Sequence, residues 1–158
     1  MLPRILSRAG RLPAVHAEDN MVIEAGKIYV APPDHRMLLL PDHIRVDRGP
    51  RDSGYRPSID RLFRSAARAY GRKVIAVVLT GNLADGTAGM RAVRRFGGVG
   101  IVQDPAEALH PGMPLSAMKH VEKECVLSLP DIAPAIVRLV NEPLAEPEVS
   151  TRELELPR

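Results

Sequence analysis

The chain has 158 residues, of which 45% are hydrophobic and 26% are charged, and its formal net charge is +3. This length and composition predict a single soluble globular domain and exclude a collagen, a disordered tail and a disulfide-stapled miniprotein. The single cysteine, Cys125, cannot form an internal disulfide bond, and no apolar run approaches the roughly 20 residues that a membrane helix needs.

The charges are distributed unevenly along the chain. Residues 1–72 contain 13 Lys or Arg against 8 Asp or Glu, whereas residues 142–158 contain 2 against 5. The basic half could attract an acidic partner, although scattered arginines more often form a solvated surface. Aromatic residues make up only 3% of the chain, too few for the stacking platforms of a nucleic-acid binder. We therefore expect no nucleic-acid partner.

The first third of the chain predicts short elements joined by turns. Residues 1–10 resemble the tail of a helix that ends at Gly10, which indicates that the chain begins inside a structural element. Three short β-type runs follow, at 27–34, 36–40 and 43–46. The turn at Pro41-Asp42 between the last two runs predicts a β-hairpin. Residues 47–56 are polar and predict a loop.

From residue 56 onward the pattern alternates between helix and strand. A helix is expected from Arg56 to Tyr70, with Pro57 in its first turn. The β-branched runs at 74–79 and 99–103 predict strands that are buried on both faces. Further helices are expected at 87–96, 115–120 and 131–140, and a third strand at 124–127. This alternation predicts a three-layer α/β fold, with a mostly parallel sheet, helices on both faces and the β-hairpin.

Two loops are expected at the carboxyl ends of the strands, where ligands bind in open parallel sheets. They are residues 79–89, which are rich in glycine, and residues 103–114. Backbone N–H groups in the first loop could hold a phosphate or stabilise an oxyanion. The sequence lacks G-x-x-x-x-G-K-[ST], which excludes a Walker-type loop, and it lacks G-x-G-x-x-G, which weakens a dinucleotide interpretation.

Asp85 is the candidate catalytic residue of the first loop. Its position before Gly86-Thr87 suits the N-cap of the helix that follows, and a carboxylate here could also orient a catalytic histidine. Both roles can coexist, because a carboxylate has two oxygens. The five histidines form no metal-type pair, and no serine lies in a G-x-S-x-G elbow. We expect no metal and no cofactor. From the residues alone, Asp85 is a candidate catalytic carboxylate, but neither a nucleophile nor a base can be identified.

Several motifs occur together and in order over about residues 1–140. They are residues 12–15, 26–32, 56–60, 79–89, 96–98, 103–105 and 112–114. Together they resemble the C-terminal catalytic domain of the chemotaxis protein-glutamate methylesterases, the CheB family. Members of that family hydrolyse methyl esters on receptor glutamates, and some also deamidate receptor glutamines. They use a serine–histidine–aspartate arrangement on an α/β sheet.

The resemblance assigns roles to particular residues. Asp85 corresponds to the aspartate that orients the histidine, and the backbone around Gly81 and Asn82 corresponds to the loop that helps form the oxyanion hole. Asn82 stands where many members have methionine. Gly86 belongs to the same loop, and Met113 lies in the second loop, where it shapes the pocket.

The family's serine and histidine motifs lie upstream of the segment that residues 1–6 match. We therefore expect a methylesterase domain over residues 1–140 that is truncated at its N-terminus, is inactive alone and associates through an uncovered sheet edge. Residues 141–158 are rich in proline and glutamate and predict a flexible tail.

Two other functions stay open beside this one. The chain could be a non-catalytic module that keeps the groove and the basic half to bind acidic receptor helices or another partner. It could also bind an anion or a nucleotide through residues 81–89. The resemblance implies a cytoplasmic protein that is not inserted in the membrane and whose partners are methyl-accepting chemotaxis receptors or related signalling proteins.

Overall fold

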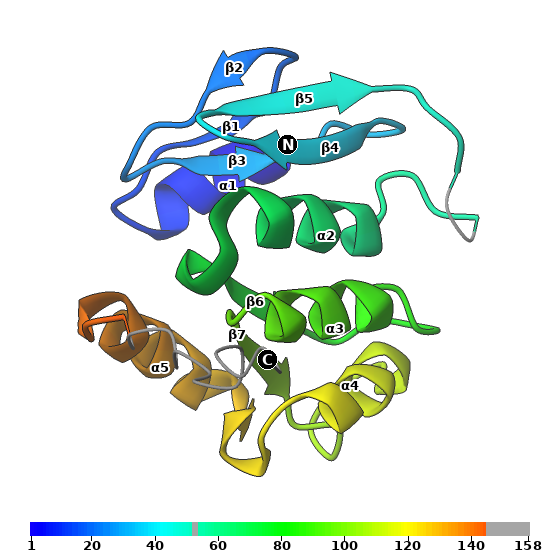
Figure 1. Cartoon of the computed structure of the whole chain (residues 1–158), viewed down its shortest axis with the longest axis vertical. Helices are drawn as coiled ribbons and strands as arrows, with labels where there is room; N and C mark the ends of the chain where they lie inside the picture. Colours follow the sequence, from blue (N-terminus) through cyan, green and yellow to red (C-terminus); the bar gives the residue numbers. More distant parts are fainter. Residues whose placement is uncertain (52–53, 145–158) are drawn as a thin grey trace, which may run out of the picture.

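The computed structural model describes residues 1–51 and 54–144, in which short strands alternate with helices (Figure 1). The strands are β1 (Ala14–His16), β2 (Met21–Val22), β3 (Ile28–Val30), β4 (Arg36–Leu40), β5 (His43–Asp47), β6 (Ile75–Val78), β7 (Val99–Gln103) and β8 (Val126–Leu127). The α-helices are α1 (Leu2–Ala9), α2 (Ile59–Tyr70), α3 (Thr87–Arg95), α4 (Gly112–Ala117) and α5 (Leu129–Asn141). Three short 3-10 turns are η1 (Gly71–Lys73), η2 (Met118–His120) and η3 (Lys123–Cys125).

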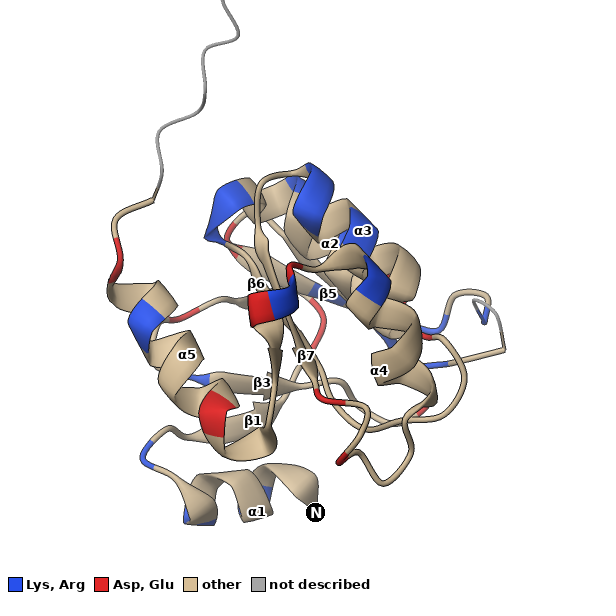
Figure 2. Cartoon of the chain, turned by 90° about the horizontal axis from the view of Figure 1, so that it is seen from below, with Lys and Arg blue, Asp and Glu red and all other residues tan. Residues whose placement is uncertain are grey.

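The second half of the chain contains a parallel sheet of β6, β7 and β8, with β7 in the middle. Helices α3 and α4 pack against one side of this sheet and α5 against the other, as Figure 2 shows. The α/β class and the helices on both faces are thus confirmed. The middle strand β7 is buried on both faces, as predicted. For β6 this prediction is wrong: Ala76 and Val78 are buried, but Ile75 and Val77 on the other face are only partly buried. Ile75 lines two open grooves beside this edge strand.

Two further sheets make up the first half. Strand β1 pairs with β3 in parallel, and β2, β5 and β4 form an antiparallel sheet. The predicted hairpin is β4–β5, which closes at the pair Leu40 and His43 around a turn in which Asp42 has φ 67°. Strands of three and two residues, such as β1 and β2, are too short to produce a periodic pattern, so the sequence did not indicate them.

Helix α2 lies between the two halves. It packs against β4 on one side and against α3 on the other (Figure 1). One core cluster fills the space among α2, α3, α4, β6 and β7; its members are Ala67, Ala76, Val78, Met90, Val93, Val102 and Ala117. A smaller cluster of Ala17, Met37 and Ile44 lies under the hairpin, and Leu62 of α2 packs against it. The same helix therefore contributes to both cores.

Some predicted boundaries differ from the structure. The first helix ends before Gly10, as expected. Pro57 is not in the first turn of α2: the helix begins at Ile59 after the N-cap Ser58. Cys125 is not in a strand, because residues 123–125 form the turn η3 and leave a two-residue strand.

The last two helices differ from the sequence prediction: α4 is shifted toward the N-terminus, and α5 is longer. Helix α4 begins at Gly112 rather than at residue 115, and α5 begins at Leu129 and ends at Asn141. Residues 145–158, most of the expected flexible tail, lie outside the described residues. Within residues 1–51 and 54–144, none of the helices combines the length and the apolar character that crossing a bilayer requires.

The first core cluster makes a prediction about stability. Val93 in α3 has no exposed surface, whereas Val140 in α5 is 68% exposed. Val93→Ala should lower the free energy of unfolding by about 2 kcal/mol, because it removes buried methyl groups and leaves a cavity. The matched substitution Val140→Ala should change it by less than about 0.5 kcal/mol. Urea unfolding of both variants measures the difference, and equal effects would contradict the assignment of the core.

Candidate active site

The two loops predicted at the carboxyl ends of β6 and β7 are joined by backbone hydrogen bonds. The N–H of Gly81 donates to the carbonyl of His110 at 2.8 Å, and the N–H of Met113 donates to the carbonyl of Gly81 at 2.8 Å. The hydroxyl of Thr80 accepts the N–H of His110 at 2.7 Å. The loops therefore form one continuous surface, as the strand order predicted.

Glycines permit this close approach. A Cβ atom at Gly81 would overlap the sulfur of Met113, and one at Gly112 would lie 2.9 Å from the backbone nitrogen of Leu83. Both distances are shorter than van der Waals contact, so a side chain at either position would push the loops apart. The first loop is also anchored to β7, because the N–H of Thr80 donates to the side-chain oxygen of the buried Gln103 at 2.9 Å.

Asp85 holds the start of helix α2. Its Oδ2 accepts the N–H of Ile59 at 2.9 Å, and its Oδ1 accepts the N–H of Asp60 at 3.0 Å. The hydroxyl of the buried Ser58 lies 3.5 Å from Oδ1. The interpretation of Asp85 as the cap of its own helix is therefore wrong. The N-cap of α3 is Gly86, where the chain turns with φ 96°, and the carboxylate satisfies the free N–H groups of a different helix.

The start of α3 is held in return by α2. Oδ1 of Asp60, in the first turn of α2, accepts the N–H of Gly89 at 2.7 Å. A Cβ atom at Gly89 would lie 2.6 Å from the Cβ of Phe63, so α2 and α3 are in close contact here. Each helix start thus receives a carboxylate from the neighbouring element, where the helix dipole favours negative charge.

A small pocket opens at this junction. It has a volume of about 250 Å³ and is lined by Tyr55, Asp60, Leu83, Ala84 and Asp85. The hydroxyl of Tyr55 is buried and finds no hydrogen-bond partner within the described residues. Leu83 is 69% exposed with φ 65°, a left-handed conformation that non-glycine residues seldom adopt and that is enriched at functional sites. The pocket thus combines a carboxylate, an unpaired hydroxyl and a strained backbone.

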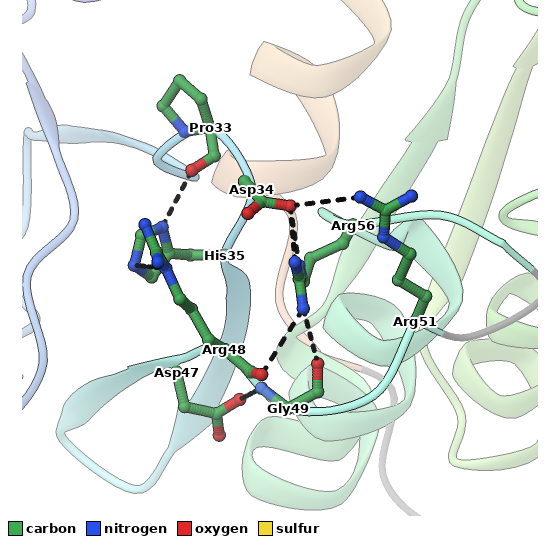
Figure 3. A network of polar contacts seen from close by, with 8 residues as sticks. All are labelled: Pro33, Asp34, His35, Asp47, Arg48, Gly49, Arg51 and Arg56. Atoms are coloured by element: carbon green, nitrogen blue, oxygen red, sulfur yellow. Dashed lines mark hydrogen bonds and ion pairs between the residues drawn. The ribbon is translucent and has the colours of Figure 1, made fainter.

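Charged contacts fix the loop that carries Tyr55 (Figure 3). The guanidinium of Arg56 donates to Oδ1 of Asp34 through Nε at 2.9 Å and through Nη2 at 2.7 Å. It also donates to the carbonyl of Gly49 at 3.1 Å, and the N–H of Gly49 donates to Asp47 at 2.8 Å. The hydrogen bond from Arg56 holds the pKa of Asp34 below its usual value. Arg36 and the N–H of Gly49 lower the pKa of Asp47 in the same way.

The structure brings the predicted site residues together, although not all of them face the pocket. Gly81 donates its N–H to His110, so this group is already used within the protein. The N–H of Asn82, on an exposed residue, makes no hydrogen bond to any residue of the described chain. Gly86 is buried, and a Cβ there would lie 3.1 Å from Ile59. Met113 covers Gly81 and shapes the loop.

Sequence reasoning missed three of the residues around Asp85. Tyr55, Ser58 and Asp60 have no sequence motif that singles them out as site residues. An acidic residue in the first turn of a helix is a local signal that could have indicated Asp60. Within residues 1–51 and 54–144, no three His, Cys, Asp or Glu side chains form a group that could hold a metal ion.

The fold and the site define an α/β domain whose polar groups gather at the carboxyl ends of parallel strands. The profile of the CheB methylesterase family matches residues 1–136, and the chain belongs to this family. It is 39% identical over 140 residues to protein-glutamate methylesterase/protein-glutamine glutaminase 1 of Rhodospirillum rubrum, a match that covers 86% of this chain and 36% of the relative. The chain therefore spans little more than a third of that relative's length.

Two other comparisons cover more of the matching protein. A putative protein-glutamate methylesterase/protein-glutamine glutaminase of Leptospira interrogans is 39% identical over 137 residues, which cover 86% of this chain and 71% of the relative. The crystal structure of the Thermotoga maritima CheB methylesterase catalytic domain superposes with a TM-score of 0.83 at 30% identity. That match covers 88% of this chain and 76% of the other.

The reciprocal contacts between α2 and α3 predict a stability effect. Asp85→Ala should lower the free energy of unfolding by about 1–2 kcal/mol, because two N–H groups at the start of α2 lose their acceptor. Asp60→Ala should have a comparable effect through Gly89. Glu124→Ala removes an exposed carboxylate with no hydrogen bond among the described residues, and it should change the value by less than about 0.5 kcal/mol. Urea unfolding that ranks Glu124→Ala with the other two would contradict the capping role.

The network of Figure 3 predicts a pH dependence. The pKa of Asp34 is lowered in the folded protein, so its contribution to stability is present above the unfolded value of about 3.9 and is lost as the pH falls through the lower folded value. Asp34→Asn should therefore be less stable than the parent at neutral pH, and the difference should shrink in acid. Chemical unfolding across this range, repeated at high salt to screen the pair, measures it. A constant difference at every pH would contradict the ion pair.

Proposed function

We propose that this chain serves in a protein-glutamate methylesterase, with Asp85 as the carboxylate that positions the catalytic histidine. The overall reaction consumes water and a glutamate methyl ester and yields methanol, a carboxylate and a proton. The serine hydroxyl would add to the ester carbonyl and release methanol, and water would then hydrolyse the acyl-serine. The names of the relatives from Rhodospirillum rubrum and Leptospira interrogans support this reaction class. The proposed substrates are methyl-accepting chemotaxis receptors, which would place the chain in the cytoplasm.

The position of Asp85 is the observation that carries the proposal. The start of α2 fixes its carboxylate from one side, while the same residue lines the pocket of about 250 Å³ on the other. An ionised carboxylate offers about four acceptor positions, so it can still accept the N–H of an imidazole. A carboxylate held in this way sets the tautomer and orientation of the histidine that it contacts.

The backbone of Asn82 is the proposed oxyanion donor. The N–H of Gly81 is occupied by the carbonyl of His110, which leaves the next N–H along the loop to face a substrate. A main-chain donor does not depend on the side chain, so asparagine in place of the common methionine retains it. The rim of the two loops carries three exposed leucines, Leu79, Leu83 and Leu109. Such a rim suits the methyl ester and a protein substrate.

The anion-binding alternative has less support. The N–H groups of Gly81, Thr87 and Gly89 all donate to acceptors inside the protein. Asp60 and Asp85 also place two carboxylates at the helix starts, where they would repel a phosphate. The non-catalytic binding module is favoured by a separate observation, the arginine groove between α2 and α3 described below.

We propose that the serine nucleophile and the histidine base come from outside these 158 residues, because the sequence contains neither family motif. The test replaces the matching segment of the Thermotoga maritima catalytic domain with residues 1–136 and measures methanol release from methylated receptor. The chimaera should release methanol, and the 158-residue chain alone should not. Asp85→Ala in the chimaera should slow the release by about 10⁴-fold, and Glu124→Ala should not change it.

Three outcomes would each overturn a part of the proposal. A folded chimaera without activity would reject this chain as a functional methylesterase segment. An Asp85→Ala chimaera as active as its parent would reject the role of the carboxylate. Methanol release by the 158-residue chain alone, lost in its Asp85→Ala variant, would show instead that a nucleophile lies within it.

A further inference from the structure

A groove rich in arginine runs between α2 and α3. It has a volume of about 580 Å³ and is lined by Arg64, Arg68, Ala88, Arg91, Ala92, Arg94, Arg95, Phe96 and His120. In Figure 2 the basic segments gather along these two helices, on the side of the sheet away from α5. No acidic residue of the described chain is among those that line the groove.

Four of the five arginines that line the groove are arranged in two pairs. Arg64 and Arg68 lie one turn apart on α2, and Arg91 and Arg95 lie one turn apart on α3. All four are exposed, and their side chains form no ion pair or hydrogen bond within residues 1–51 and 54–144. Arg94 differs, because it pairs with Glu122 at 2.9 Å.

This arrangement costs stability in the isolated chain. Like charges one turn apart on a helix repel each other, and here a second such pair faces the first across the groove. An anionic partner would remove the repulsion and supply acceptors for the guanidinium groups, which bind carboxylates through two parallel hydrogen bonds. The small side chains of Ala88 and Ala92 also line the groove and leave room for a partner to approach.

We propose that this groove binds an acidic helix of a protein partner, with glutamates one turn apart that face the arginine pairs. The periodic spacing of the arginines along two helices favours a helical ligand. The net charge of +3 and the 3% of aromatic residues disfavour a nucleic acid. The sequence leaves an acidic partner for the basic half open as an alternative to a solvated surface, but only packing brings residues 64 and 68 beside residues 91 and 95.

The groove adjoins the candidate active site. Ala88 in the groove precedes Gly89, whose N–H is bonded to Asp60 of the pocket. A helix bound along α2 and α3 would therefore have one end near Asp85. The identification of this helix as a glutamate-bearing segment of the substrate receptor rests on the proposed function, whereas binding of an acidic helix does not.

The test measures binding and needs no activity. The probe is a fluorescein-labelled helical peptide with glutamate at every fourth position, and its control has glutamine at those positions. Fluorescence anisotropy with the full chain should show salt-sensitive binding of the glutamate peptide only. The variant with Arg64, Arg68, Arg91 and Arg95 all replaced by glutamine should bind about 30-fold more weakly. The double variant Arg64→Gln/Arg91→Gln should lie between the two.

A matched control uses Arg4 and Arg8, which lie one turn apart on α1 without a facing arginine pair on another helix. Arg4→Gln/Arg8→Gln should bind like the parent. Equal loss in this control, equal binding of the glutamine peptide, or unchanged affinity of the quadruple variant would overturn the inference. Tighter binding of oligouridine RNA, lost in the quadruple variant, would overturn it in favour of a nucleic-acid site. The proposed function is tested separately by methanol release from the chimaera, so a failure of peptide binding would overturn this inference alone.

Discussion

The carboxylates of Asp85 and Asp60 each cap the start of the neighbouring helix, and the arrangement of the described chain depends on this exchange. Helix α2 packs against the hairpin sheet, and α3 packs against the parallel sheet. Joining the two helix starts therefore joins the two core clusters at one point. The close approach at Gly89 allows the exchange, because any larger residue would meet Phe63 and separate the helices.

The same constraint forms the candidate active site. Asp85 holds α2 from the loop after β6, which turns at Gly86, and the same loop contributes Leu83 and Ala84 to the lining of the pocket. The second loop is then fixed on top through the backbone of Gly81. A residue proposed for catalysis is thus also part of the structural framework. Measurements on Asp85 variants therefore require stability and activity to be determined together.

Much of this arrangement was predictable from the sequence. The rest was not predictable, and the reasons are physical. The β-branched runs and glycine-rich loops indicated the α/β class and the two loops that meet at the site, and the turn at Pro41-Asp42 indicated the hairpin. The partner of Asp85 was not predictable, because local pattern assigns a cap to the nearest helix, whereas Ile59 is 26 residues away. Cys125 lies in a turn, although the apolar residues that follow it have the pattern of a strand. The four arginines of the groove come together only through the packing of α2 on α3.

The position of α2 between the two halves has a mechanical consequence. One end of this helix forms a wall of the pocket through Asp60, and its exposed side forms a wall of the groove through Arg64 and Arg68. A rigid helix cannot shift at one wall without shifting at the other. The arginines Arg64 and Arg68 and the N–H groups that hold Asp85 belong to the same helix. A partner bound in the groove and the carboxylate of Asp85 would therefore both act on the position of one helix, α2.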